Sequence, residues 1–390
     1  MSFFLSTPGI VCAAGHDLAA LREAVFASEP SGVAMNDAVW PGHPLHLGAV
    51  TKPLPSVAHL PLAQRSRNNA LLLAALEQIR AQVDVAIASH GASRVGVVLG
   101  TSTSGVAEGE AAIAALARDG GLPTGFHVEQ QELGSPAMML AQLLGLGGPR
   151  YVVSTACSSG AKALASGARL LKAGLCDAVI VGGVDALCGM TVAGFTALES
   201  VDAQRCRPMS ASRAGINIGE GAALFVLSRK PSAVRLSGWG ESSDAHHISA
   251  PEPAGRGALA AMREALQRAD LTPADIGYLN LHGTATPQND AMESRAVAEL
   301  FGLDLPCSST KPLTGHALGA AGAIEAVIAW LAVVGDGRLP VHHFDGLRDA
   351  DLPAIQLAAP GQRLARSPRH VMSNSFAFGG NNASLVLSHV

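Results

Sequence analysis

Charged and aromatic residues are scarce in this 390-residue sequence, at 15% and 4% of the total. Disordered chains are rich in charge and poor in apolar residues, so the hydrophobic content of 48% excludes that class. With so few aromatic residues, the core must be built from Ala, Val, Leu and Gly, whose small side chains let helices and sheets approach closely. The formal net charge of −4 argues against a nucleic-acid-binding protein, which would carry an excess of Lys and Arg.

Signals for secretion, membrane insertion and metal binding are also missing. Residues 3–15 are apolar, but the first arginine is Arg22, so the basic start of a signal peptide is absent. The apolar run 313–334 contains His316 and Glu325, which predicts a buried helix rather than a membrane span. The six cysteines form no CxxC pair, so we expect free thiols, a cytoplasmic location and no structural metal.

Short runs rich in β-formers alternate with helical patterns, which predicts an α/β fold with covered sheets. These runs are residues 94–99, 151–154, 178–181, 222–228, 276–281 and 370–373. Two segments have the same organisation, because in each a predicted strand and a reactive side chain precede an Ala/Gly-rich helix. The two predicted helices are residues 158–172 and 317–334. A helix that is apolar all round is buried. We therefore expect two similar halves, 1–235 and 236–390, which meet at these two helices.

Cys157 is the first candidate for chemistry, because it ends a predicted strand and begins a predicted helix. The unpaired N–H groups and the positive end of a helix dipole favour a thiolate, which is the nucleophilic form of cysteine. The alternative is a small core residue, since cysteine is often buried. The other five cysteines lack such a setting and are interpreted as core.

Two histidines and a lysine form a second group of candidates. His282 follows a predicted strand in the run His-Gly-Thr-Ala-Thr-Pro, and Lys311 and His316 lie five residues apart before an apolar helix. The ordinary explanation for either histidine alone is a hydrogen-bonded structural residue. A lysine among apolar elements needs a partner when it is buried, and Glu293 and Glu325 are the candidate counter-charges. The alternative for both acids, above all for Glu293, is a solvated helix face.

Four motifs in order give the sequence a resemblance to the β-ketoacyl-acyl-carrier-protein synthases of the thiolase superfamily. They are Thr-Ala-Cys-Ser-Ser-Gly at 155–160, His-Gly-Thr-Ala-Thr-Pro at 282–287, Lys-Pro-Leu-Thr-Gly-His at 311–316 and Ser-Phe-Ala-Phe-Gly-Gly at 375–380. The similarity covers nearly the whole chain. It implies a thiolase-like, five-layer α-β-α-β-α fold built from two similar halves.

The resemblance also implies a role for each matching residue. Cys157 looks like the nucleophile that carries an acyl group, and its N–H and that of Phe378 look like the oxyanion hole. His282 and His316 look like the pair that stabilises the enolate of a decarboxylating malonyl thioester, which is typical of elongating enzymes rather than thiolases. The supporting residues implied are Lys311, the acids Glu325 and Glu293, the gating Phe378, and Thr284, Thr286 and Ser243 along the phosphopantetheine arm. No cofactor or metal is implied.

Three departures from the common family pattern favour a specialised polyketide or aryl polyene pathway over ordinary fatty acid synthesis. Ala377 stands where glycine is usual before the second phenylalanine, and it would restrict the loop if a positive φ were needed. Residues 100–105 are rich in hydroxyl groups, and Ser210 stands where an aspartate is common. A chain-length-factor-like subunit without catalysis and a coenzyme A-dependent thiolase are the competing interpretations.

The partners implied are an acyl carrier protein and a second subunit in a dimer. Carrier proteins are acidic, so we expect a local basic rim, with Arg65, Arg67, Arg205 and Arg207 as candidates. Scattered surface charge is the alternative explanation of these arginines. The second subunit is either another copy of this chain or a chain-length-factor-like sister that lacks the cysteine.

Overall fold

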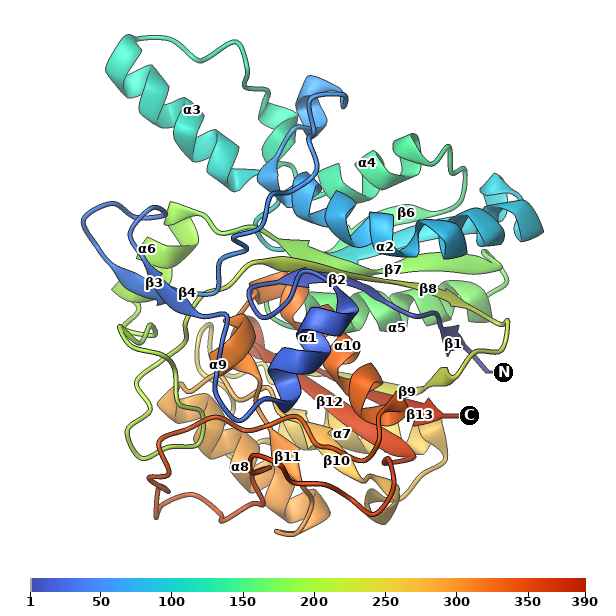
Figure 1. Cartoon of the computed structure of the whole chain (residues 1–390), viewed down its shortest axis with the longest axis vertical. Coiled ribbons are helices and arrows are strands. Elements are labelled where there is room, and N and C mark those ends of the chain that lie inside the picture. Colours follow the sequence, from blue (N-terminus) through green and yellow to red (C-terminus); the bar gives the residue numbers. More distant parts are fainter. Residues whose placement is uncertain (1) are drawn as a thin grey trace.

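The N-terminal half of the chain is a sheet covered by helices on both faces. The computed structural model describes residues 2–390, and Figure 1 shows its layers. The strands are β2 (Gly9–Cys12), β5 (Val95–Gly100), β6 (Arg150–Val153), β7 (Ala178–Asp185) and β8 (Gly221–Ser228). The outer face is covered by α2 (Arg67–His90) and α4 (Ser135–Leu143). Every residue of β5 and β7 is buried, as expected for β-branched runs with helices on both sides.

The C-terminal half repeats this arrangement. Its strands are β9 (Val234–Ser243), β10 (Tyr278–Asn280), β11 (Cys307–Ser308), β12 (His370–Ala377) and β13 (Asn381–His389). Its outer helices are α7 (Arg256–Ala269) and α8 (Pro287–Phe301). The short β1 (Phe4–Leu5) pairs with both β8 and β9, so the two halves form one sheet in the order β11-β10-β12-β13-β9-β1-β8-β7-β5-β6, with β2 beside β8.

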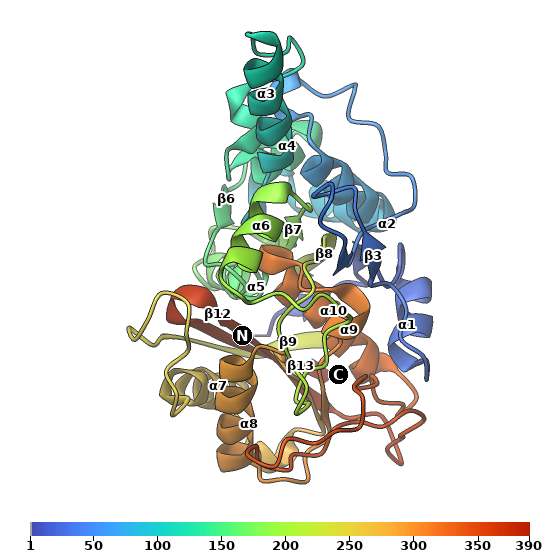
Figure 2. The ribbon, with the colours of Figure 1, turned by 90° about the vertical axis from the view of Figure 1, so that its left-hand side faces the viewer.

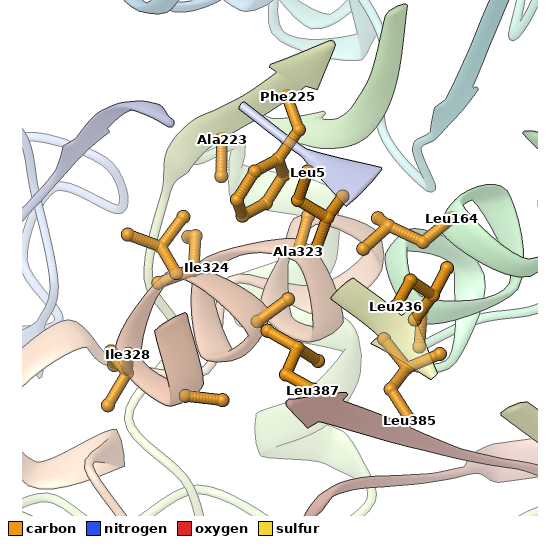
Figure 3. Close-up of a cluster of buried hydrophobic side chains, with 14 of the residues drawn as sticks. Leu5, Leu164, Ala223, Phe225, Leu236, Ala323, Ile324, Ile328, Leu385 and Leu387 are labelled. Atoms are coloured by element: carbon orange, nitrogen blue, oxygen red, sulfur yellow. The ribbon is translucent and has the colours of Figure 1, made fainter. Parts of the chain in front are cut away.

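Two helices fill the layer between the halves, α5 (Ser159–Lys172) and α10 (Ala321–Val334). The structure therefore confirms the predicted α-β-α-β-α order. Figure 3 shows the core of this layer, where Leu164 of α5 and Ile324 of α10 lie among side chains from β1, β8, β9 and β13. The helices approach closely because glycines face each other's backbones. A Cβ built at Gly160 would lie 2.7 Å from the amide nitrogen of Ala323.

The remaining elements lie at the edges of the layers. They are α1 (Leu18–Phe26), α3 (Val106–Asp119), α6 (Gly189–Ala197), α9 (Lys311–Thr314), β3 (Ala34–Asn36), β4 (Leu45–Leu47) and the 3-10 turns η1 (Leu62–Gln64), η2 (Ala92–Arg94), η3 (Val128–Gln131), η4 (Pro273–Asp275), η5 (Leu318–Ala320) and η6 (Phe378–Gly380). In both views α3 projects away from the layers (Figures 1 and 2). Within residues 2–390, no helix is long and apolar enough to cross a membrane.

One expectation about the central helices is wrong. Helix α10 is buried along nearly its whole length, but α5 exposes Arg169 and Lys172 and half-buries Lys162 and Ser166. These polar residues recur every three or four positions and form one solvent-facing stripe. The stripe is hard to recognise in the sequence because many small residues lie between its members. The predicted boundary between the halves, after residue 235, falls just inside β9 and stays a prediction.

Candidate active site

A cavity of about 160 Å³ lies where the two halves meet. The N-terminal half contributes Cys157 to its wall, and the C-terminal half contributes His282, His316 and Phe378. The sulfur and one ring nitrogen of each histidine lie within 4.8 Å of one another. Residues predicted from separate motifs are thus brought to one reacting centre.

Cys157 lies in the turn between β6 and α5, and the backbone there is constrained. The preceding Ala156 has φ +51°, a conformation that residues other than glycine adopt rarely and that collects at functional sites. The Sγ atom of Cys157 is 3.0 Å from Nε2 of His316. The backbone N–H groups of Phe378 and of Cys157 itself point at this sulfur, which is the arrangement predicted for an oxyanion hole.

The expectation that Cys157 rests as a thiolate is wrong. Burial raises the pKa of its thiol to about 11, although the Lys311 ammonium and the two N–H groups act in the opposite direction. Helix α5 begins only at Ser159, so Cys157 precedes the helix and is not in its first turn. The resting group at neutral pH is therefore a thiol, which must lose its proton as it attacks.

Lys311 is buried and connects the two catalytic segments. Its Nζ donates to the carboxylate of Glu325 and to the backbone oxygen of His282, and lies 3.4 Å from Nδ1 of His282. An ammonium group only donates, so Nδ1 of His282 accepts and the proton of the neutral ring sits on Nε2. Glu325 therefore balances Lys311, as predicted, and burial raises the pKa of its carboxyl to about 7.

Both histidines are neutral. Burial and then the nearby Lys311 hold the pKa of His282 and that of His316 well below the usual range. The two rings meet edge to face, with centroids 5.4 Å apart. The backbone N–H of His316 donates to Asn217 O at 2.6 Å, which fixes the start of the segment. Neutral imidazoles can donate N–H to a developing enolate without adding a full charge.

Glu293 has a different role from the one predicted. Its side chain is buried, but its oxygens accept hydrogen bonds from the backbone N–H groups of His282 at 2.8 Å and Gly283 at 2.7 Å. Among residues 2–390, the acid that forms an ion pair with Lys311 is Glu325. Glu293 thus fixes the backbone that positions His282. Burial raises the pKa of the Glu293 carboxyl to about 7.

The predicted phosphopantetheine residues are only partly brought together. Thr284 and Thr286 line the cavity, and their hydroxyl oxygens are 2.9 Å apart. Ser243 is exposed at the end of β9 and does not line the cavity. Sequence analysis missed Asn289 and Asn382, which do line it. Their positions, three residues after Thr286 and two after Gly380, were the available signal.

The loop that carries Phe378 forms part of the cavity wall, and the gating role of Phe378 stays a prediction. The Phe378 ring lies 5.6 Å from that of Phe195, and both line the cavity. Ala377 has φ −104°, while Gly379 and Gly380 have φ +80° and +72°. Alanine at position 377 therefore causes no backbone strain, because the residues with left-handed backbone are Gly379 and Gly380.

The four predicted rim arginines do not form one patch of free charge. Arg67 pairs with the buried Glu220, and Arg207 pairs with an aspartate at 3.2 Å. Arg65 and Arg67 line neither this cavity nor the second one described below, whereas Arg205 and Arg207 line the second. The carrier-protein rim remains a prediction without support from this arrangement.

Cys157, His282 and His316 also have the ligand types of a zinc site, since thiolate and imidazole both bind zinc. The neutral thiol and its hydrogen bond to His316 equally suit acyl transfer. Fold and site together define a thiol-dependent condensing enzyme.

Comparisons with known proteins agree with that class. Residues 62–233 match the N-terminal domain of β-ketoacyl synthases, and residues 233–345 match the C-terminal domain. A 3-oxoacyl-[acyl-carrier-protein] synthase 2 of Staphylococcus aureus is 34% identical over 337 residues, which are 81% of this chain and 82% of that protein. The chain therefore belongs to the β-ketoacyl synthase family and is an acyltransferase.

Solved structures show the same relationship. A ketosynthase from Xenorhabdus doucetiae, in complex with its chain length factor, is 45% identical with a TM-score of 0.95, covering 100% of this chain and 98% of that one. The ishigamide ketosynthase/chain length factor has a TM-score of 0.88, 24% identity and coverage of 100% and 99%, so it supports the fold alone.

Proposed function

We propose that this chain extends an acyl group held on Cys157 by two carbons, using malonyl thioester carried by an acyl carrier protein. The observation that carries the proposal is the meeting of one thiol and two neutral imidazoles within 4.8 Å, beside the Lys311–Glu325 pair. The free, buried cysteines fit a reducing cytoplasmic location.

The first step is transfer of the acyl group to Cys157. As Sγ attacks the thioester carbonyl, His316 Nε2 at 3.0 Å accepts the thiol proton. The N–H groups of Cys157 and Phe378 stabilise the oxyanion, and the carrier leaves as a thiol after taking up the proton. Because the pKa of Cys157 is about 11, the proton leaves during the attack rather than before it.

The second step is decarboxylation of the malonyl group. The carbon–carbon bond to its carboxylate breaks, carbon dioxide leaves, and the electron pair becomes an enolate on the thioester. Nε2–H of His282, held in that tautomer by Lys311, donates to the enolate oxygen, and His316 joins it in the tautomer that carries its proton on Nε2. The enolate carbon then attacks the acyl carbonyl on Cys157, which releases a 3-oxoacyl chain on the carrier and the Cys157 thiolate. The thiolate takes up a proton from water and returns to the resting thiol.

The pathway and partner form the finer part of the proposal. We propose that the chain is the ketosynthase subunit of a specialised polyketide or aryl polyene system and pairs with a chain length factor. The support is the Xenorhabdus doucetiae ketosynthase, which matches the whole of this chain and was solved with such a factor. A homodimer is the alternative.

The test is to incubate the protein with an acyl-carrier and malonyl-carrier and to weigh the products. The proposal predicts carbon dioxide release and a 3-oxoacyl-carrier two carbons longer than the donor. Exchange of acetyl groups with coenzyme A, without decarboxylation, would instead identify a thiolase. No turnover alone, followed by turnover with a chain length factor, would identify the heterodimer as the active form.

A further inference from the structure

A second cavity, of about 590 Å³, lies outside the catalytic one and shares no lining residue with it. Its wall is built from residues 28–30, 204–207, 342–344, 346, 348 and 357–360. Residues 204–207 lie beside the segment that follows His342, since Arg207 Nη1 is 4.0 Å from Asp345 Oδ2. Its size is in the range of small-molecule sites, which run from roughly 300 to 1,000 Å³.

Two arginines bring positive charge to this cavity and form no ion pair in the described chain, although the carboxylate of Glu29 also lines the wall. Arg205 donates only to backbone oxygens of Ser31, Val33 and Pro312, at 2.5–3.1 Å. Arg348 reaches only Ile355 O, at 3.4 Å. Across residues 2–390 neither forms an ion pair, whereas the third lining arginine, at 207, is paired with an aspartate.

Two histidines on the same wall differ in what they can still bind. His342 is fully used, because Nδ1 accepts from Ser309 N–H at 3.0 Å and Nε2 donates to Pro208 O at 2.9 Å. His343 is 8% exposed, and its Nε2 has no hydrogen-bond partner within the described chain. A buried polar atom without a partner is costly, so His343 has a free hydrogen-bonding position.

We propose that this cavity binds a small organic anion whose phosphate or carboxylate group is held by Arg205, Arg348 and His343. Guanidinium groups suit both anions, because their N–H donors match the oxygens in pairs. Apolar lining from Phe344, Leu357 and Pro360 accommodates the organic part of the ligand.

The walls of this site continue into the catalytic segments. Arg205 Nη1 donates to Pro312 O at 2.5 Å, beside Lys311 in α9. His342 accepts from Ser309, whose hydroxyl donates to Gly283 O at 2.6 Å, next to His282. The wall of the site is therefore hydrogen-bonded to the backbone segments that carry Lys311 and His282.

Binding of three matched probes tests the proposal, namely phenyl phosphate, benzoate and the neutral benzyl alcohol. We expect one saturable site per chain by titration calorimetry for phenyl phosphate or benzoate, with the tighter of the two identifying the anion class, and none for benzyl alcohol. Cys157→Ala should bind the probe equally well, which separates this site from the catalytic cavity. Absence of saturable binding for both anions would overturn the proposal.

Variants locate the site. Arg348→Gln should weaken binding at least tenfold, since a charge-assisted hydrogen bond is lost, while Arg263→Gln, on the exposed face of α7, should leave it unchanged. Gln204→Glu removes no contact made by the Gln204 side chain and places a carboxylate beside Arg205, so it should abolish binding even if Arg348→Gln is poorly folded. Unchanged binding by a folded Gln204→Glu protein would contradict the assignment.

Discussion

At the catalytic cavity, Cys157, His282 and His316 have only 5%, 1% and 2% of their surface exposed. Burial disfavours the charged form of each side chain. Cys157 is therefore a thiol, where the sequence alone suggested a thiolate, and both imidazole rings are neutral. The chemistry therefore depends on donors that are already oriented, since none of these three side chains carries a resting charge.

His282→Ala should slow malonyl decarboxylation by about a hundredfold, the effect of removing one oxyanion donor. Loading of Cys157 should fall by less than about tenfold, because it is His316 whose ring nitrogen contacts the sulfur. Carbon dioxide release and intact mass measure the two steps separately. The exposed His90→Ala serves as the control, and equal losses in both steps would refute this division of roles.

Glu293 should make the protein less stable as pH rises. Its pKa is about 7 in the fold against about 4.5 when unfolded, so between these values only the folded state holds the proton. Its contribution is fully present below pH 4.5 and is lost as pH rises through 7, by on the order of 3 kcal/mol.

Denaturant unfolding of the wild type and of Glu293→Gln from pH 5 to 8 measures this contribution. The difference between the two proteins should fall with pH, whereas Glu299→Gln, exposed on the same helix, should track the wild type. A difference independent of pH would show that Glu293 is ionised in the fold across this range.

The meeting of Cys157, His282 and His316 in one cavity was predictable from sequence, but their protonation and contacts were not. Motif order placed Cys157 with the histidines, and the structure confirms that they meet. The pKa of Cys157 depends on burial by segments distant in sequence. Glu293 was predicted to balance Lys311 because the two side chains have opposite charges, yet its oxygens accept hydrogen bonds from backbone N–H groups. Such bonds cannot be predicted from side-chain types, because every residue except proline has a backbone N–H.

Helices α5 and α10 hold the two halves together through small residues. A methyl group at Gly160 would lie 2.7 Å from Ala323 N and 3.0 Å from Gly319 O, both backbone atoms that cannot turn away. The alternation of strands with Ala/Gly-rich helices was enough to predict the layers. The polar stripe of α5 was missed because small residues dominate its composition.

Gly160→Ala should therefore destabilise the protein by about 1–3 kcal/mol, the usual effect of overpacking a core. Gly194→Ala in α6 is the matched control, because a Cβ there meets nothing within 4 Å and alanine favours a helix. Thermal unfolding of both variants compares them directly. Equal stability of Gly160→Ala and the wild type would mean that the central helices can separate.

At the scale of the whole molecule, the sheet ends at β6 with an unpaired edge in the described chain. Val97 N–H and Thr101 N–H donate to the oxygens of residues 149 and 153, so Val152 between them directs its N–H away from β5. An open edge of this kind can pair with a second subunit.

Val152→Pro should abolish pairing, because proline removes the outward donor, while Val152→Ala should retain it. Native mass spectrometry of the chain, alone and co-expressed with a chain-length-factor-like subunit, measures the assembly. We expect a one-to-one heterodimer for the wild type and a monomer for Val152→Pro. Dimers that survive in a folded Val152→Pro protein would place the interface elsewhere.

The central claim is that Cys157 carries the acyl group, and intact mass after incubation with an acyl-carrier tests it most directly. The wild type should gain the mass of one acyl group on the peptide that contains Cys157, and Cys157→Ala should gain none. Cys176→Ala, which alters a cysteine outside the cavity, should be acylated like the wild type. An acyl adduct that persists in Cys157→Ala would contradict the account.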